Sequence, residues 1–338
     1  MPGDVQAEGL TKDFRTFQRE EGIRGAVKSL FVRRYNTVRA VDAVSFAIQP
    51  GEMVGYIGPN GAGKSTTVKM LTGIVEPTAG SAVVNGFDPY RERTRYTHTI
   101  GVVFGQRTQL WWDIAVVESF RLLQRIYGVS DADYQVRMDV FDQVLEIRRY
   151  LNTPVRKLSL GERMRCDLAA SLIHNPPLLF LDEPTIGLDV VAKVNVRQFL
   201  KEINRRYGTT MLLTTHDLTD IEEMCKRLMI IDHGRVLFDG ALAMLKRQLW
   251  RQMQVKIELK EAAQAAALEA LPLNSIHKER VDELTYKLSF DRERHTAGEV
   301  IRQIVASVDV RDIFIEEEPI EEIVRRIYTG PGVLEFGR

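Results

Sequence analysis

The chain has 338 residues, of which 44% are hydrophobic and 27% are charged, a composition typical of folded globular domains and unlike that of disordered or fibrous proteins. At roughly 100–200 residues per domain, this length suggests two domains, or three. The 46 basic and 46 acidic residues cancel, which argues against a general binder of nucleic acid.

The first elements predicted along the chain are two strands separated by a basic segment. A short strand ends at Phe14, and residues 38–48 alternate between apolar and polar residues like a second strand. Between them, residues 15–34 carry apolar positions at helical spacing, which predicts a short amphipathic helix. Such a helix lies either against anionic headgroups or a membrane partner, or against its own domain.

Strands and helices alternate through the middle of the chain. Helices are predicted at 64–71 and over most of 115–150, and a hairpin is predicted at 81–87 around Asn85-Gly86. Four short apolar runs suit strands of a parallel sheet buried on both faces. These runs lie at 54–57, 178–181, 211–213 and 228–231. The pattern predicts an α/β domain over residues 1–245.

The remaining residues, 246–338, have a different rhythm. Alternating apolar residues predict strands, and amphipathic stretches predict helices. In chain order the pattern is strand, helix, strand, strand, helix, strand, helix, which predicts a small α+β domain of ferredoxin-like type. The individual predictions are strands at 253–259, 284–290 and 311–316 and helices at 261–271, 296–307 and 319–328.

A glycine-rich loop stands between the strand at 54–57 and the helix at 64–71. Its sequence is Gly58-Pro59-Asn60-Gly61-Ala62-Gly63-Lys64-Ser65-Thr66, which fits the phosphate-loop pattern G-x-x-x-x-G-K-[ST]. Glycines let backbone N–H groups approach phosphate oxygens, and the helix N-terminus adds partial positive charge. Lys64 brings a charge to the β- and γ-phosphates, and the Ser65 hydroxyl can bind Mg²⁺. ATP and Mg²⁺ are therefore the predicted cofactors.

Two acidic residues, Asp182 and Glu183, follow the apolar run at 178–181. A carboxylate at the C-terminal end of a strand faces the crevice where nucleotides bind in open α/β sheets. We expect Asp182 to hold Mg²⁺ through water and Glu183 to polarise the attacking water. Taken alone, the pair fits a simple turn cap better.

A further segment, Leu158-Ser159-Leu160-Gly161-Glu162, precedes a helix and completes a set of motifs. With it, residues 5–245 resemble the nucleotide-binding domain of ABC transporters. Six motifs appear in the family's order, and together they are far more specific than any one alone. They are the phosphate loop at 58–66, the Q-loop Gln106, the signature at 158–162, the Walker B pair Asp182 and Glu183, the D-loop Asp189 and the switch histidine His216.

The resemblance implies a P-loop NTPase cassette with a RecA-like core, an antiparallel β subdomain and a helical subdomain. Two cassettes would pair head to tail around two ATP molecules. Ser159 and the Gly161 backbone N–H would then bind the γ-phosphate held by the partner's loop, and Glu162 is counted with them among the nucleotide-binding residues. The family also implies that Gln106 touches Mg²⁺ or the water and that His216 hydrogen-bonds the γ-phosphate. Asp189 would cross the dimer interface.

The sequence departs from the family pattern at the signature and near the first strand. Leu160 stands where a second glycine is usual, and Glu162 often is glutamine in the family. The insertion at 15–34 leaves two aromatic residues, Phe14 and Tyr35, that could stack on adenine. Tyr35 is slightly favoured because it keeps the usual distance to residues 40–42.

Partners follow from the same resemblance. The cassette would act as a homodimer or heterodimer at the cytoplasmic face of the membrane, driving export through separate permease subunits of the ABC-2 type. The N-terminus has no signal-peptide pattern and no apolar run reaches about 18 residues, so we expect this chain itself not to cross a bilayer. Trp111 and Trp112 either line the groove for a permease helix or pack in the core.

Two readings compete with an exporter subunit. One is a soluble ABC-type ATPase with a non-transport role, and the other is a regulatory module without chemistry. The domain at 246–338 is assigned an accessory or dimerisation role. The cysteines Cys166 and Cys225 fit no disulfide framework or metal spacing and are predicted to be buried thiols.

Overall fold

The structure is a computed structural model that describes residues 3–17, 35–105, 107–249, 252–272, 275–292, 294–316 and 320–329. The chain divides into two compact units, residues 1–240 and 241–338. Within the described ranges, no helix combines the length and apolar character that crossing a membrane requires. The helix predicted within 15–34 falls outside the described residues, except that residues 15–17 extend the first strand.

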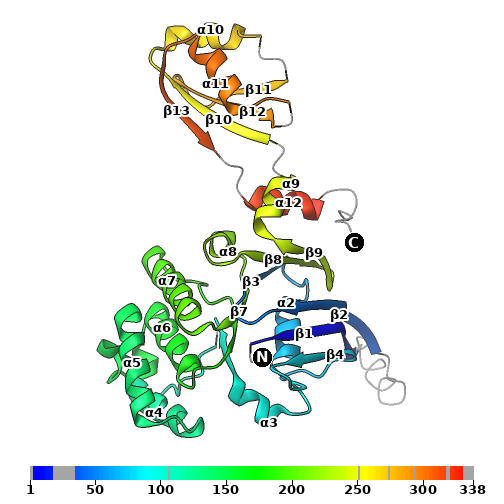
Figure 1. Ribbon diagram of the computed structural model, residues 1–338, viewed down its shortest axis with the longest axis vertical. Coiled ribbons are helices and arrows are strands. Elements are labelled where there is room, and N and C mark those ends of the chain that lie inside the picture. Colours follow the sequence, from blue (N-terminus) through cyan, green and yellow to red (C-terminus); the bar gives the residue numbers. More distant parts are fainter. Residues whose placement is uncertain are drawn as a thin grey trace, which may run out of the picture. The chain divides into compact units, whose positions relative to one another are not determined.

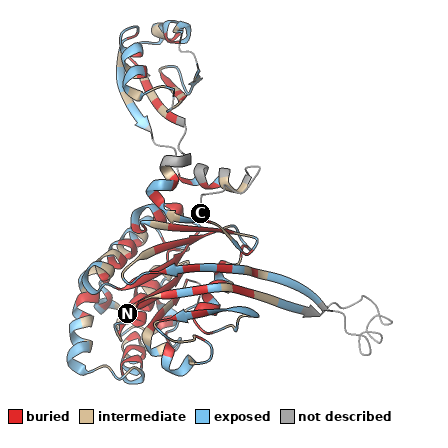
Figure 2. Cartoon of the chain, turned by 45° about the vertical axis from the view of Figure 1, so that its right-hand side comes forward, coloured by how far each residue is buried: buried red, intermediate tan, exposed pale blue. Residues whose placement is uncertain are grey.

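A six-stranded sheet forms the centre of the first unit, with strand order β5-β6-β7-β3-β8-β9. Figure 1 labels β7, β3, β8 and β9 of this sheet. The strands from β5 to β8 pair in parallel. The four predicted apolar runs lie in these strands and are buried, as expected for a sheet covered on both faces (Figure 2). The strands are β3 (Met53–Ile57), β5 (Ile100–Phe104), β6 (Leu178–Asp182), β7 (Thr210–Thr214), β8 (Arg227–Asp232) and β9 (Arg235–Ala241).

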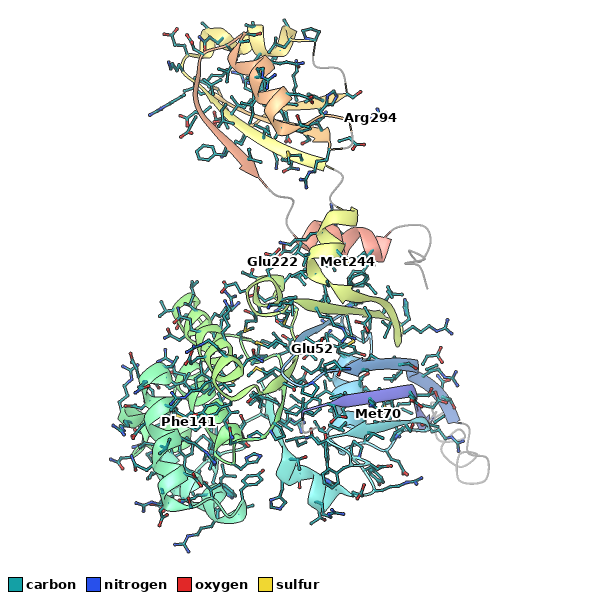
Figure 3. All side chains as sticks on the ribbon, in the orientation of Figure 1. Glu52, Met70, Phe141, Glu222, Met244 and Arg294 are labelled. Carbon is teal, nitrogen blue, oxygen red and sulfur yellow. The ribbon has the colours of Figure 1, made fainter. Side chains whose placement is uncertain are left out.

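Helices α4 to α7 gather at one end of this unit (Figure 1). Helices α4 and α5 confirm the prediction that most of residues 115–150 are helical. Phe141 of α5 and Phe199 of α7 are fully buried there, with their ring centroids 5.9 Å apart (Figure 3). The helices are α2 (Lys64–Leu71), α3 (Arg93–Tyr96), α4 (Val116–Ile126), α5 (Asp131–Leu145), α6 (Leu160–Leu172), α7 (Val190–Tyr207) and α8 (Leu218–Met224).

A second, antiparallel sheet of the first unit has the order β2-β1-β4. It consists of β1 (Val5–Phe17), β2 (Tyr35–Ile48) and β4 (Ala79–Val84). The turn of the hairpin predicted at 81–87 is confirmed, but the pairing across it is limited to one bridge. Asn85 and Gly86 do form a tight turn with positive φ, and Val84 pairs with Phe87, but the partner strand of β4 is β1. Met70 of α2 belongs to a buried cluster with residues of both sheets (Figure 3).

The second unit contains a four-stranded antiparallel sheet with the order β11-β12-β10-β13. Two helices complete the β-α-β-β-α-β order, which is the ferredoxin-like arrangement that the sequence pattern predicts. The elements are β10 (Gln252–Leu259), α10 (Ala265–Ala270), β11 (Ile276–Arg280), β12 (Thr285–Asp291), α11 (Ala297–Val305) and β13 (Val310–Glu316).

Two further helices flank this sheet in the chain. Helix α9 (Leu242–Leu249) comes before β10, and α12 (Ile320–Thr329) comes after β13. The two helices contact one another. Leu245 of α9 and Ile320 of α12 are fully buried, because each helix turns an apolar stripe inward. The ferredoxin-like part of the chain therefore begins and ends at two helices that lie together.

Candidate active site

The phosphate loop joins β3 to α2, as the sequence predicts. Gly63 has φ 105°, a left-handed conformation that glycine adopts readily. A Cβ at this position would come within 2.4 Å of the carbonyl oxygen of Ala40. No side chain caps the start of α2, and its first turn holds no acidic residue. The N–H groups of this turn are therefore free of side-chain acceptors and suited to an anion.

Lys64 lies over its own loop. Its Nζ donates hydrogen bonds to the carbonyl oxygens of Gly58 and Pro59, at 2.6 and 3.1 Å. The residue is only 8% exposed. Burial lowers the pKa of Lys64, while the charges of Glu183 and Asp182 act in the opposite direction. The ammonium group is thus within electrostatic range of two carboxylates.

Asp182 ends β6 beside the end of β7, because parallel strands present their carboxyl ends at the same edge of a sheet. Its Oδ1 accepts hydrogen bonds from Thr214 Oγ1 at 2.5 Å and from Ser65 Oγ at 3.4 Å. A hydroxyl and a carboxylate are oxygen ligands of the kind that Mg²⁺ prefers. Ser65 and Asp182 therefore fit a Mg²⁺ site, although the described residues contain no cluster of three His, Cys, Asp or Glu that could hold a metal alone. Gln106, the third predicted ligand, lies outside the described residues.

Glu183 occupies a strained backbone position. Its φ is 57°, which is uncommon for a residue with a side chain. The Glu183 N–H donates to the carbonyl oxygen of Thr214 at 2.9 Å. The Nδ1 of His216 donates to Oε2 of Glu183 at 2.7 Å, and the imidazole is 64% exposed. The predicted base and the predicted switch histidine are therefore direct neighbours.

These groups share one cavity of about 650 Å³. The cavity is open at the surface that carries the phosphate loop. Its lining consists of Ala40, Asn60, Gly61, Gly63, Lys64, Ser65, Thr66, Glu183, Ile186 and His216. A neighbouring cavity of about 330 Å³ shares Ser65 and Glu183 and adds Asp182. The fold thus brings together cation, hydroxyl, carboxylates and imidazole from three separate segments.

The signature segment forms the N-terminus of α6. Ser159 is the N-cap, and Glu162 completes a capping box with it. The Ser159 N–H donates to Glu162 Oε2 at 2.8 Å, and the Glu162 N–H donates to Ser159 Oγ at 3.3 Å. The Glu162 carboxylate therefore has a capping role at the start of α6. Leu160 lies against Gly187, because a Cβ added at Gly187 would come within 2.7 Å of Leu160 Cδ2.

The signature segment is apart from the phosphate-loop cavity of its own chain. Among the described residues that line this cavity, none belongs to 158–162. Instead, Gly161 neighbours Leu188 and Ala192 at the start of α7. Asp189, the D-loop residue, caps α7 by accepting a hydrogen bond from the Ala192 N–H at 2.8 Å. Ser159 and Asp189 are both exposed and lie on neighbouring helix N-termini.

Phe14 and the two tryptophans are exposed on the first unit. Phe14 is 39% exposed on β1 and pairs with Val38 of β2, two residues before the cavity residue Ala40. The backbone of Tyr35 begins β2, but its side chain lies outside the described residues. Trp111 and Trp112 are 41% and 49% exposed, so the alternative that they pack in the core was wrong.

The sequence reasoning missed Thr214, which holds the Asp182 carboxylate. The available signal was its position at the end of a predicted strand, two residues before His216. The predicted burial of the cysteines is confirmed: Cys166 and Cys225 are buried, and burial raises each thiol pKa to about 12.

The chain resembles known proteins over most of the first unit. The ABC transporter family model matches residues 41–186. The ABC transporter ATP-binding protein NatA of Bacillus subtilis (strain 168) is 33% identical over 64% of this chain and 87% of NatA. A Nod factor export ATP-binding protein I of Burkholderia pseudomallei (strain K96243) is 38% identical over 63% of this chain and 69% of that protein.

Solved structures show the same fold. A dimeric ATP-binding cassette in a post-hydrolysis state, bound to ADP and Pi, superimposes with a TM-score of 0.58 at 25% sequence identity. The match covers 70% of this chain and 98% of that chain. The prediction of an α/β ATP-binding cassette is therefore confirmed.

Proposed function

This chain belongs to the ATP-binding subunits of ABC transporters and is an ATPase, and from that premise we propose that it drives export through separate permease subunits. Export is supported by the name of the similar Nod factor export protein. The motif resemblance to cassettes that serve ABC-2 type exporters also supports it. In this proposal the chain works at the cytoplasmic face of the membrane as a peripheral subunit.

One observation carries the proposal that the cassette acts as a head-to-tail dimer. Lys64, Glu183 and His216 share a cavity to which the signature residues of the same chain do not contribute. A second copy, turned head to tail, would bring its own Ser159 and Gly161 N–H group to the open side of that cavity. The N-terminus of α6 then supplies donors to the γ-phosphate, as helix N-termini do for anions.

The polar and charged residues in and around the cavity have proposed roles in hydrolysis. The phosphate loop and Lys64 orient the phosphates and offset their charge. Glu183 accepts a proton from the attacking water, and His216 holds both Glu183 and the γ-phosphate. Mg²⁺, held by Ser65 and Asp182 and by Gln106 as the family resemblance implies, would neutralise charge on the phosphates. Asp189 is proposed to reach across the dimer.

The proposed permease-docking surface consists of Trp111, Trp112, Ile114 and Leu122, which are each 38–49% exposed. Exposed aromatic side chains are favoured anchors of protein interfaces. Replacing both tryptophans by alanine should reduce co-purification of polytopic membrane proteins from detergent extracts by about tenfold and leave the ATPase of the free chain unchanged. The control is Val136→Ala, which shortens another exposed apolar residue. Equal recovery with both variants would contradict this surface.

Phe14 is the proposed adenine platform, because it is exposed beside the strand that carries Ala40. Loss of an aromatic face that stacks on a base reduces affinity. We expect Phe14→Ala to weaken ATP binding about tenfold, with little effect on kcat. Titration with a fluorescent ATP analogue measures this, and Phe14→Tyr, which keeps the ring, is the control. Unchanged affinity in Phe14→Ala would leave Tyr35 as the platform.

A further inference from the structure

A buried polar cluster behind the active site takes no part in the roles proposed above. It consists of Asp220 in α8, Arg197 in α7, Thr185 after β6 and Thr215 after β7. Asp220 is 0% exposed, and each of the other three is 7% exposed or less. A buried carboxylate is unfavourable unless it is paired and hydrogen-bonded, so a cluster of this kind requires a complete set of partners.

Asp220 has partners from three different segments. Its Oδ1 accepts from Arg197 Nε at 2.5 Å. Its Oδ2 accepts from the Thr185 hydroxyl and, at 3.3 Å, from the Thr215 hydroxyl. One carboxylate therefore joins a helix to the two loops that follow β6 and β7.

These two loops carry the proposed catalytic groups. Thr185 stands two residues after Glu183, whose backbone has the positive φ described above. Thr215 directly precedes His216, and its Oγ1 accepts a hydrogen bond from the N–H of Asp217 at 3.0 Å. This hydrogen bond joins Thr215 and Asp217, which are the two chain neighbours of His216. Strained positions persist where the surrounding structure holds them in place.

The remaining charges around Arg197 fix the helix that carries Asp220. Arg197 Nη1 lies 2.8 Å from Oε1 of Glu223, and Lys193 Nζ lies 2.6 Å from Oδ2 of Asp217. Asp217 in turn caps α8 by accepting from the Thr219 N–H at 3.1 Å. Helix α7 therefore holds the start of α8 through several ion pairs. These contacts fix the position of Asp220 relative to α7.

We propose that Asp220 is a positioning residue that couples the Glu183 loop to the His216 loop and so maintains their 2.7 Å contact. This inference rests on the catalytic roles proposed for Glu183 and His216. Neither threonine lines the phosphate-loop cavity, so the cluster acts on these residues through the backbone. Displacement of a catalytic group by a fraction of an ångström lowers the rate without removing a binding contact.

The test replaces the Thr185 hydroxyl and leaves the charges intact. Thr185→Val has the same shape but no hydroxyl, and Thr185→Ser keeps the hydroxyl. We expect Thr185→Val to lower kcat about tenfold with KM for ATP unchanged within about twofold. Thr185→Ser should stay close to wild type in both. Asp220→Asn is a poorer variant, because it would leave Arg197 with a buried, uncompensated charge.

Two results with the Thr185 variants would overturn the inference. One is wild-type kcat in Thr185→Val. The other is an equal loss of activity and thermal stability in the Val and Ser variants, which indicates packing alone. As a second measurement, Thr215→Val should also lower kcat, and the double variant should lose less than the product of the two single effects, because both act through one carboxylate. Independent, multiplicative effects would also contradict coupling through Asp220.

The proposed function can fail separately from this inference. Glu183→Gln is assayed in parallel. If Glu183→Gln keeps full activity, the assignment of the base is wrong. If it is inactive while Thr185→Val is normal, the base stands and only the positioning role of Asp220 is overturned.

Discussion

Replacing Glu183 by glutamine should lower the ATPase rate by at least about a hundredfold while leaving ATP binding intact. The amide keeps the size of the side chain, and its oxygen can still accept the hydrogen bond that His216 Nδ1 donates at 2.7 Å. The phosphate loop and Lys64 are unchanged. Only the group that accepts the proton of the attacking water is lost. ATP should therefore bind and stay bound without being hydrolysed.

The same variant should accumulate as a dimer in the presence of ATP. Size-exclusion chromatography with and without Mg-ATP measures the dimer, and phosphate release measures the rate. The matched control is Glu8→Gln, the same isosteric change at an exposed carboxylate of β1, which should behave as wild type. An undiminished ATPase rate in Glu183→Gln would refute its role as the base.

Placing an aspartate at Gly161 should abolish this ATP-dependent dimer. Gly161 lies in the first turn of α6, and a Cβ there would make only ordinary contacts, the nearest at 3.6 Å to Ala192. An acidic residue near a helix N-terminus is favourable for the helix, so the variant should fold. Its carboxylate would, however, face the γ-phosphate bound by the partner cassette.

We therefore expect Glu183→Gln/Gly161→Asp to remain monomeric with ATP, while its ATP affinity stays within a few-fold of that of Glu183→Gln. Gly161→Asp alone should lose at least about a hundredfold in ATPase rate, as expected when donors to a transferring phosphoryl group are blocked. A matched control exists in Gly298→Asp, because Gly298 also stands two residues after the N-cap of a helix with a capping box and meets no atom within 4 Å. A normal ATP-dependent dimer in the double variant would rule out the head-to-tail arrangement.

Much of the active site could be predicted because its parts are local in sequence. The phosphate loop needs only a strand, a set of glycines and a helix start in succession, and all three are where the sequence predicts them. Asp182 and Glu183 were placed by the rule that strand ends meet at one edge of a parallel sheet. Their pairing with Ser65 and His216 then follows from the adjacency of β6, β7 and β3.

Other features depend on contacts between distant segments and could not be predicted. The cluster around Asp220 requires the relative register of α7 and α8, which the apolar pattern of either helix leaves open. Strand β4 pairs with β1, a distant segment of the chain, and the local turn chemistry at Asn85-Gly86 predicts only the tight turn that follows β4. The exposure of Trp111 and Trp112 likewise depends on distant contacts, because the Trp111 N–H donates to Ser119 of α4 and Arg163 of α6 lies over the Trp112 ring.

The contact between α9 and α12 determines how the ferredoxin-like segment is joined to the rest of the chain. Because these helices lie together, the ferredoxin-like segment between them begins and ends at nearly the same place. Segments with neighbouring ends can be lost, gained or exchanged without displacing the polypeptide on either side. The ferredoxin-like module is therefore joined to the chain at a point where it can be replaced by another while the helix pair stays in place.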